Sequence, residues 1–134
     1  MKKYDAVIIG FGKGGKTLAG KLAGQGKKVA MIEKDAGMYG GTCINVGCIP
    51  SKSLIRSSGL AFNKKEASPE ERTADYEAAI DEKRRLTSML REKNFRKLDD
   101  LENVDVYNGI ASFVSNTVVE VKMAEETFEI KGEK

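Results

Sequence analysis

A glycine-rich turn close to the N-terminus constrains this sequence more than any other feature. A short apolar, β-branched run at residues 5–9 leads into GFGKGG at residues 10–15, which fits the pattern G-x-G-x-x-G. A helical pattern at 13–23 and a second apolar run at 28–33 follow. In a β-α-β unit the first glycine permits the tight turn, the second lets a diphosphate approach the backbone, and the third lets helix and strand pack closely. We therefore expect a β-α-β unit over residues 4–33.

Two details sharpen this expectation. Leu18, Ala19, Leu22 and Ala23 should share the inner side of the helix. Glu33 ends the second run, about 20 residues past the glycines, where a carboxylate can accept hydrogen bonds from a ribose. The pattern favours dinucleotide binding at the helix N-terminus, and the alternative is a tight strand–helix turn without a ligand.

Both cysteines, Cys43 and Cys48, lie in a second motif, GGTCINVGCIPSK, at residues 40–52. In a regular helix, residues five apart have Cα atoms roughly 8–9 Å apart, beyond the roughly 7 Å limit for a disulfide. A bond between the cysteines therefore requires a distorted helix, which Asn45 and Gly47 would tolerate. Thr42 as N-cap would place Cys43 at a helix N-terminus, where the dipole favours a thiolate.

The residues alone leave other interpretations of the cysteines open. They are equally consistent with two unrelated buried thiols in a reduced protein. A zinc site is disfavoured, because it needs more ligands than two thiols and the chain contains no histidine. We expect no metal site.

Length and charge limit the class of protein. A chain of 134 residues makes at most one domain, and 23 basic against 20 acidic residues give a net charge of +3. That balance argues against nucleic acid or an anionic membrane as a partner. We see neither an 18-residue apolar run nor a signal peptide, and so expect a cytoplasmic location, where a catalytic disulfide is favoured over a static one.

Later segments complete an α/β prediction. We expect one helix through the cysteine motif, residues 41–62, and a long helix at 69–102 that begins with Ser68 as N-cap, Pro69 and a capping box to Glu71. We interpret the charged stretch of this helix as a solvated face rather than a docking surface. A strand at 104–108, a turn at Asn108-Gly109 and a three-stranded antiparallel meander within 110–131 follow.

Taken together, the motifs resemble those of the flavin-dependent pyridine nucleotide–disulfide oxidoreductases, the family of dihydrolipoamide dehydrogenase, glutathione reductase and mercuric reductase. The resemblance covers the whole chain, 1–134, from GFGKGG through Glu33 and the cysteine motif to GIASF at 109–113. The flank at 37–39 looks more like the mercuric-reductase-like or reactive-chlorine-resistance branch than glutathione reductase. The implied fold is an incomplete Rossmann-like FAD-binding domain, a parallel sheet with helices plus the meander.

The resemblance also implies roles for single residues. Cys43 matches the thiol that attacks substrate, and Cys48 the thiol next to the flavin. Lys13 and Gly14 match the pyrophosphate contacts, Glu33 the ribose contact, Thr42 a phosphate contact, Lys52 a lysine near flavin N5, and Ala111 an adenine contact. The full cofactor-binding set implied is Gly10, Gly12, Lys13, Gly14, Gly15, Glu33, Lys34, Gly41, Thr42, Cys48, Lys52 and Ala111.

In such a protein, electrons pass from NADH or NADPH to FAD, then to the Cys43–Cys48 disulfide, and on to a disulfide, metal-ion or quinone substrate. Family members are longer, usually form homodimers and carry a His–Glu pair that this histidine-free chain lacks. We therefore expect the N-terminal portion of a larger enzyme, inactive and a weak FAD binder by itself, with an open sheet edge that permits self-association.

Two other functions remain as alternatives. One is a non-catalytic nucleotide-binding module whose cysteines only pack in the core. The other is a small thiol–disulfide exchanger that works without flavin.

Overall fold

The computed structural model describes residues 1–134. The central strand of its parallel sheet is β3, Val29–Glu33. It pairs in parallel with β2, Ala6–Ile9, on one side and with β4, Val104–Asn108, on the other, so the strand order is β2-β3-β4. The sequence VAMIE is almost wholly buried, as expected for a parallel strand that is covered on both faces.

Because successive side chains of a strand point to opposite faces, β3 contributes to two separate cores. Val29 and Met31 join a cluster on the helical face, whose buried members are Phe11, Ala19, Ala23, Val29, Met31, Leu98 and Val104. Ala30 and Ile32 join a cluster on the opposite face, whose buried members are Tyr4, Ala30, Ile32, Val119, Val121 and Ile130. The parallel sheet is therefore the middle of three layers.

Helix α1, Lys13–Gly24, connects β2 to β3 and covers the helical face together with the C-terminal part of α4, Pro69–Asp99. The β-α-β unit is as predicted, with one difference on its helix. Leu18 is 50% exposed rather than on the inner side, because Ala19 and Ala23 face the sheet and Leu18 is turned one position away from them.

The third layer is a four-stranded sheet in the order β1-β7-β6-β5. Three of its strands form the predicted antiparallel meander, namely β5 (Ile110–Phe113), β6 (Val118–Lys122) and β7 (Thr127–Gly132). The fourth, β1, Lys2–Tyr4, was not predicted, and it pairs in parallel with β7. This pairing covers one edge of the meander.

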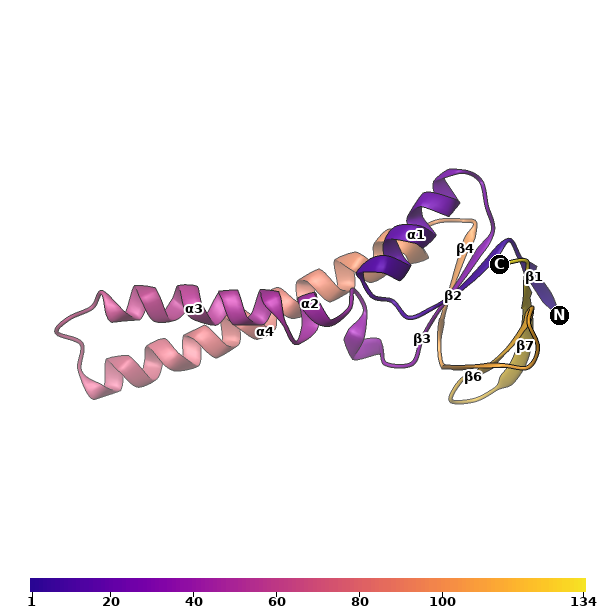
Figure 1. Cartoon of the computed structure of the whole chain (residues 1–134). Helices are drawn as coiled ribbons and strands as arrows, with labels where there is room; N and C mark the ends of the chain where they lie inside the picture. Colours follow the sequence, from indigo (N-terminus) through magenta and orange to yellow (C-terminus); the bar gives the residue numbers. More distant parts are fainter.

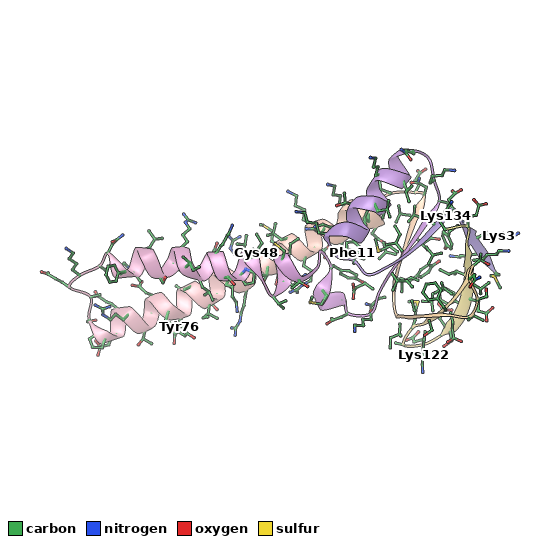
Figure 2. The ribbon with its side chains drawn as sticks, viewed as in Figure 1. Lys3, Phe11, Cys48, Tyr76, Lys122 and Lys134 are labelled. Atoms are coloured by element: carbon green, nitrogen blue, oxygen red, sulfur yellow. The ribbon has the colours of Figure 1, made fainter.

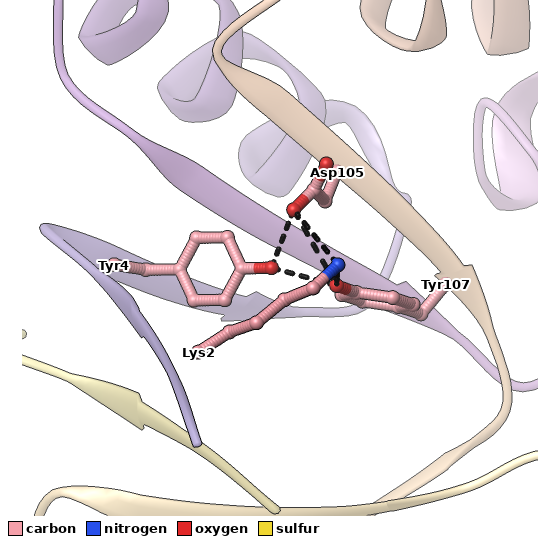
Figure 3. Close-up of polar contacts among 4 residues, drawn as sticks. All are labelled: Lys2, Tyr4, Asp105 and Tyr107. Carbon is pink, nitrogen blue, oxygen red and sulfur yellow. Dashed lines mark hydrogen bonds and ion pairs between the residues drawn. The ribbon is translucent and has the colours of Figure 1, made fainter. Parts of the chain in front are cut away.

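A polar cluster joins the third layer to the parallel sheet (Figure 3). The Tyr4 hydroxyl lies 2.5 Å from Asp105 Oδ2 and 2.6 Å from the Tyr107 hydroxyl, and Lys2 Nζ donates to the Tyr107 hydroxyl at 3.1 Å. Tyr4 is only 3% exposed, and this burial strongly raises the pKa of its phenol. A protonated Tyr4 therefore ties β1 to β4.

A two-helix hairpin projects from this three-layered body (Figure 1). It consists of α3, Cys48–Phe62, and α4, which lie side by side. The predicted capping box is present at the start of α4, where Ser68 Oγ accepts from the Glu71 amide at 3.1 Å and Glu71 Oε2 accepts from the Ser68 amide at 2.9 Å. Helix α4 ends at Asp99, so the predicted end at residue 102 is wrong.

The single helix predicted at residues 41–62 is also wrong. A short 3-10 turn, η1 (Ala36–Met38), leads into a one-turn helix, α2 (Thr42–Asn45), and the backbone breaks at Val46 and Gly47 before α3 begins. None of the helices combines the length and apolar character needed to span a bilayer.

Candidate functional site

The glycine turn lies at the carboxyl end of β2 and opens into helix α1. Gly10 has φ +103°, in the region that only glycine adopts without strain, and its carbonyl oxygen would overlap a methyl group placed on Gly15. A methyl group on Gly12 or Gly14 would meet no atom within 4 Å, so space remains open in front of the turn. The first amides of α1 have no partner within the helix, which makes this a suitable cradle for a diphosphate.

Glu33 is fixed beside this turn. Its Oε2 accepts from the Phe11 amide at 2.8 Å and its Oε1 from the Asp35 amide at 3.1 Å. A carboxylate oxygen can accept two hydrogen bonds, so each oxygen keeps a free position that can accept from a hydroxyl group. The structure therefore places Glu33 where the sequence predicts it, at the end of β3 next to the glycines.

The segment before the cysteines crosses directly over the glycine turn. The Gly40 amide donates to the Phe11 carbonyl at 3.0 Å, and a methyl group on Gly41, which has φ +86°, would lie only 2.8 Å from Gly12 Cα. Tyr39 packs between the rings of Phe11 and Phe95, with centroid distances of 5.1 and 4.7 Å. These contacts bring the cysteine motif to the glycine turn without a side chain in between.

Both cysteines are exposed free thiols at the base of the hairpin, and Figure 2 shows Cys48 at the start of α3. The break at Val46 and Gly47 separates α2 from α3, and the two cysteine side chains interact across it. The proposal that the cysteines only pack in the core is therefore wrong. The site holds a dithiol that solvent can reach.

The expected thiolate at Cys43 is not favoured in this reduced form. The hydrogen bond with the Cys48 thiol raises the pKa of Cys43, and the opposing effects of the Cys48 amide and of Lys13 are smaller. The predicted N-cap is also wrong, because Gly41 occupies that position and makes no side-chain cap, while Thr42 is the first helical residue. Helix α2 has a single turn, and the pKa of Cys43 is raised although Cys43 lies at its N-terminus.

Two polar contacts that the sequence did not predict hold α4 against this site. Arg91 Nε donates to Asn45 Oδ1 at 2.8 Å, and Lys16 Nζ donates to Asn94 Oδ1 at 2.6 Å. Desolvation lowers the pKa of Lys16, and the charges of Lys97 and Lys13 act in the same direction. The only signal in the sequence was Asn45 itself, a polar residue between the cysteines, since its partner lies far along the chain.

The remaining predicted site residues lie around this centre at different distances. Lys52 is exposed on α3 one turn after Cys48, which puts both side chains on one face of the helix. Lys34 is exposed directly after β3. Ala111 lies on β5 in the other sheet, where it packs against the second core. Gly109 connects that sheet to the site, because its amide donates to the Glu33 carbonyl at 2.9 Å.

Comparison with known proteins agrees with this geometry. Residues 4–134 match the sequence profile described as pyridine nucleotide-disulphide oxidoreductase. The chain belongs to this family. Among the curated members, the probable pyridine nucleotide-disulfide oxidoreductase RclA of Escherichia coli is 46% identical over 134 residues, which are 100% of this chain and 28% of RclA. A mercuric reductase of Lysinibacillus sphaericus is 37% identical over 126 residues, 90% of this chain and 23% of that enzyme.

A solved structure of another family member has the same fold. The Cu(II) complex of the HOCl-induced flavoprotein disulfide reductase RclA from Escherichia coli superimposes with a TM-score of 0.84 at 46% identity, over 100% of this chain and 28% of that one. The predicted family is confirmed, and RclA and mercuric reductases are among the relatives, in line with the predicted branch. The chain spans about a quarter of the length of these family members.

Proposed function

We propose that this chain forms the FAD cradle and the redox-active cysteine pair of a flavin-dependent disulfide reductase. The observation that carries the proposal is the close approach of Gly41 to Gly12, which joins an exposed cysteine pair to an open glycine turn. A nucleotide in the turn would thus lie beside two thiols that can form a disulfide.

The chain's own groups fit FAD. The amides at the start of α1, including those of Lys13 and Gly14, would bind the pyrophosphate, and Glu33 would accept from the ribose hydroxyls. Gly41 approaches the same turn, and Thr42 would contact the phosphates beside it. Lys52 and Cys48 would lie nearer the flavin ring, and Lys34 and Ala111 nearer the adenosine. FAD, when bound, supplies the two-electron chemistry that connects a nicotinamide donor to the cysteines.

The cysteines would perform the exchange chemistry. Two electrons and two protons convert the Cys43–Cys48 disulfide to the dithiol. The thiolate of Cys43 then attacks a substrate disulfide and releases one substrate thiol. The Cys48 thiolate attacks Cys43 in the mixed disulfide, releases the second substrate thiol and restores the Cys43–Cys48 disulfide.

The donor, substrate and assembly belong to the same proposal. We propose NADH or NADPH as donor, a disulfide, metal ion or quinone as substrate, and a cytoplasmic homodimer as the working form. Support for a metal-ion substrate comes from the family, which includes a Cu(II) complex of RclA and several mercuric reductases. Exchange without flavin is a second candidate, because both thiols are exposed.

Flavin fluorescence tests the cradle directly. FAD should bind the chain, and Gly14→Asp should weaken binding more than tenfold, because it adds a negative charge where the pyrophosphate would lie. No atom stands within 4 Å of a methyl group at this position, so the fold should tolerate the change. Gly14→Ala is the matched uncharged control and should bind much more tightly than Gly14→Asp. Equal FAD binding by the two variants would contradict the cradle.

A second measurement tests the redox pair. Photoreduced FAD should convert the oxidised chain to a form with two free thiols, and Gly14→Asp should slow this reaction strongly. Equal rates in the two proteins, together with rapid exchange between the thiols and small disulfides, would favour the flavin-free exchanger instead.

A further inference from the structure

The backbone break between α2 and α3 decides how far apart the two cysteines lie. Val46 (φ −137°, ψ 0°) and Gly47 (φ −121°, ψ −111°) are both non-helical. A methyl group on Gly47 would lie 3.1 Å from the Thr42 carbonyl oxygen and 3.5 Å from Cys43 Cα. The chain therefore folds back onto Cys43 before α3 begins. Without this break the cysteines would have the helical separation of roughly 8–9 Å, too long for a disulfide.

Asn45 holds the turn that precedes the break. Its side-chain amide donates to the carbonyls of Tyr39 and Gly41, both at 2.9 Å, and its Oδ1 accepts from Arg91 Nε at 2.8 Å. Both amide hydrogens and the oxygen are thus engaged, which fixes the orientation of the side chain. Asn45 lies between the cysteines in sequence, so its orientation affects the geometry of both.

Arg91 differs from the other paired arginines of α4. Arg85 and Arg96 each bind a glutamate one turn away on the same helix, at exposed positions. Arg91 is half-buried, takes part in none of the ion pairs, and makes its contact with a residue 46 positions away. Its one directed hydrogen bond therefore goes to the residue that holds the cysteine turn.

We propose that Arg91 is a positioning residue for the cysteine pair and that it lowers the redox potential of the Cys43–Cys48 disulfide by holding Asn45. This inference rests on the proposed function, because it requires that the two thiols form a disulfide. Loss of Arg91 frees Asn45 Oδ1 and lets the break relax toward regular helix. The relaxed backbone separates the sulfurs, so it disfavours the disulfide relative to the dithiol.

The equilibrium with glutathione measures this effect. In the reaction, the dithiol and oxidised glutathione give the Cys43–Cys48 disulfide and two molecules of reduced glutathione, so electrons and protons balance. The fraction of disulfide is counted by mass spectrometry after alkylation at several glutathione ratios. Arg91→Met should lower the equilibrium constant for disulfide formation about tenfold, which corresponds to a potential about 30 mV less reducing.

Arg96→Met is the matched control, because Arg96 lies on the same helix and binds only Glu92 at the surface. It should leave the equilibrium constant unchanged within a factor of two. Asn45→Ala, which leaves α4 intact, should reproduce the tenfold loss even if Arg91→Met disturbs that helix. Adding Arg91→Met to Asn45→Ala should cause no further loss, because the two residues act through one contact.

The possible outcomes separate this inference from the proposed function. If the unmodified chain forms no disulfide between its cysteines under oxidising glutathione, the proposed function fails. If it forms one and neither Arg91→Met nor Asn45→Ala changes the constant, only the role of Arg91 is overturned. A loss from Arg91→Met that persists fully in the Asn45→Ala background also overturns it, because Arg91 would then act through its charge.

Discussion

The three-layered body and the projecting hairpin are built on different principles (Figure 1). In the body, β3 buries both of its faces, and nearly all of the core lies there. In the hairpin, large apolar side chains such as Ile55, Phe62 and Tyr76 stay exposed, and Thr87, itself 7% exposed, is the only buried residue between the cysteines and Leu98. The body is specified by many packed contacts, and the hairpin by helix caps and a few polar bonds. The candidate site lies where the two meet.

The largest effect should come from the tightest contact in the body. Gly15→Val places a side chain against the Gly10 carbonyl oxygen and should destabilise the chain by about 4 kcal/mol or more in urea unfolding. Gly14→Ala, one residue earlier in open space, should stay within about 1 kcal/mol of the original protein. Similar stabilities of the two variants would mean that the turn does not pack as described.

The next largest difference in stability should come from truncating an apolar side chain in the body and one in the hairpin. Ile32→Ala removes a side chain that is 1% exposed and should cost about 3 kcal/mol. Ile55→Ala removes one that is 69% exposed and should cost less than about 0.5 kcal/mol. Denaturant unfolding measures both, and a large loss for Ile55→Ala would show that the hairpin has a core of its own.

The stability of the hairpin should instead depend on the helix cap at Ser68. Ser68→Ala removes the bond to the Glu71 amide and should cost about 1 kcal/mol. Hydrogen exchange should show faster opening of the first turns of α4, while β3 remains protected. Ser58→Ala is the control, because its hydroxyl only contacts the Ile55 carbonyl on an exposed face. Equal exchange in the two variants would contradict the importance of the cap.

The smallest effect is expected at the cysteines, where the hairpin joins the body. The neighbouring Cys48 side chain raises the pKa of Cys43, so Cys48→Ala should lower that pKa. More Cys43 would then be thiolate at pH 8, and alkylation by iodoacetamide should become faster by a factor of a few. The midpoint of the rate–pH profile should move to lower pH. An unchanged or higher midpoint would show that the thiols do not interact in solution.

The difference between local patterns and contacts distant in sequence explains which features could be predicted from sequence. GFGKGG and the capping box at Ser68 are local patterns in which each residue has one structural role, and both are present as predicted. The strand Lys2–Tyr4 was missed because it is short and partly charged, and its partner β7 lies at the other end of the chain.

The sequence indicated that Asn45 and Gly47 would tolerate a distortion between the cysteines, but it did not decide whether the helix breaks there. The local sequence permits either a helix or a turn, and the contacts that favour the turn come from Arg91 and from the crossing over Gly12. The candidate site residues could therefore be proposed from sequence, but their spacing could not. The cysteine geometry depends on tertiary contacts more than the glycine turn does.

The backbone contact between Gly41 and Gly12 has a mechanical consequence. Because no side chain separates the two backbones, any shift of the segment at Gly41 displaces the turn at Gly12. Under the proposed function, formation of the disulfide would therefore alter the glycine turn, and a nucleotide bound at the turn would alter the geometry of the cysteines.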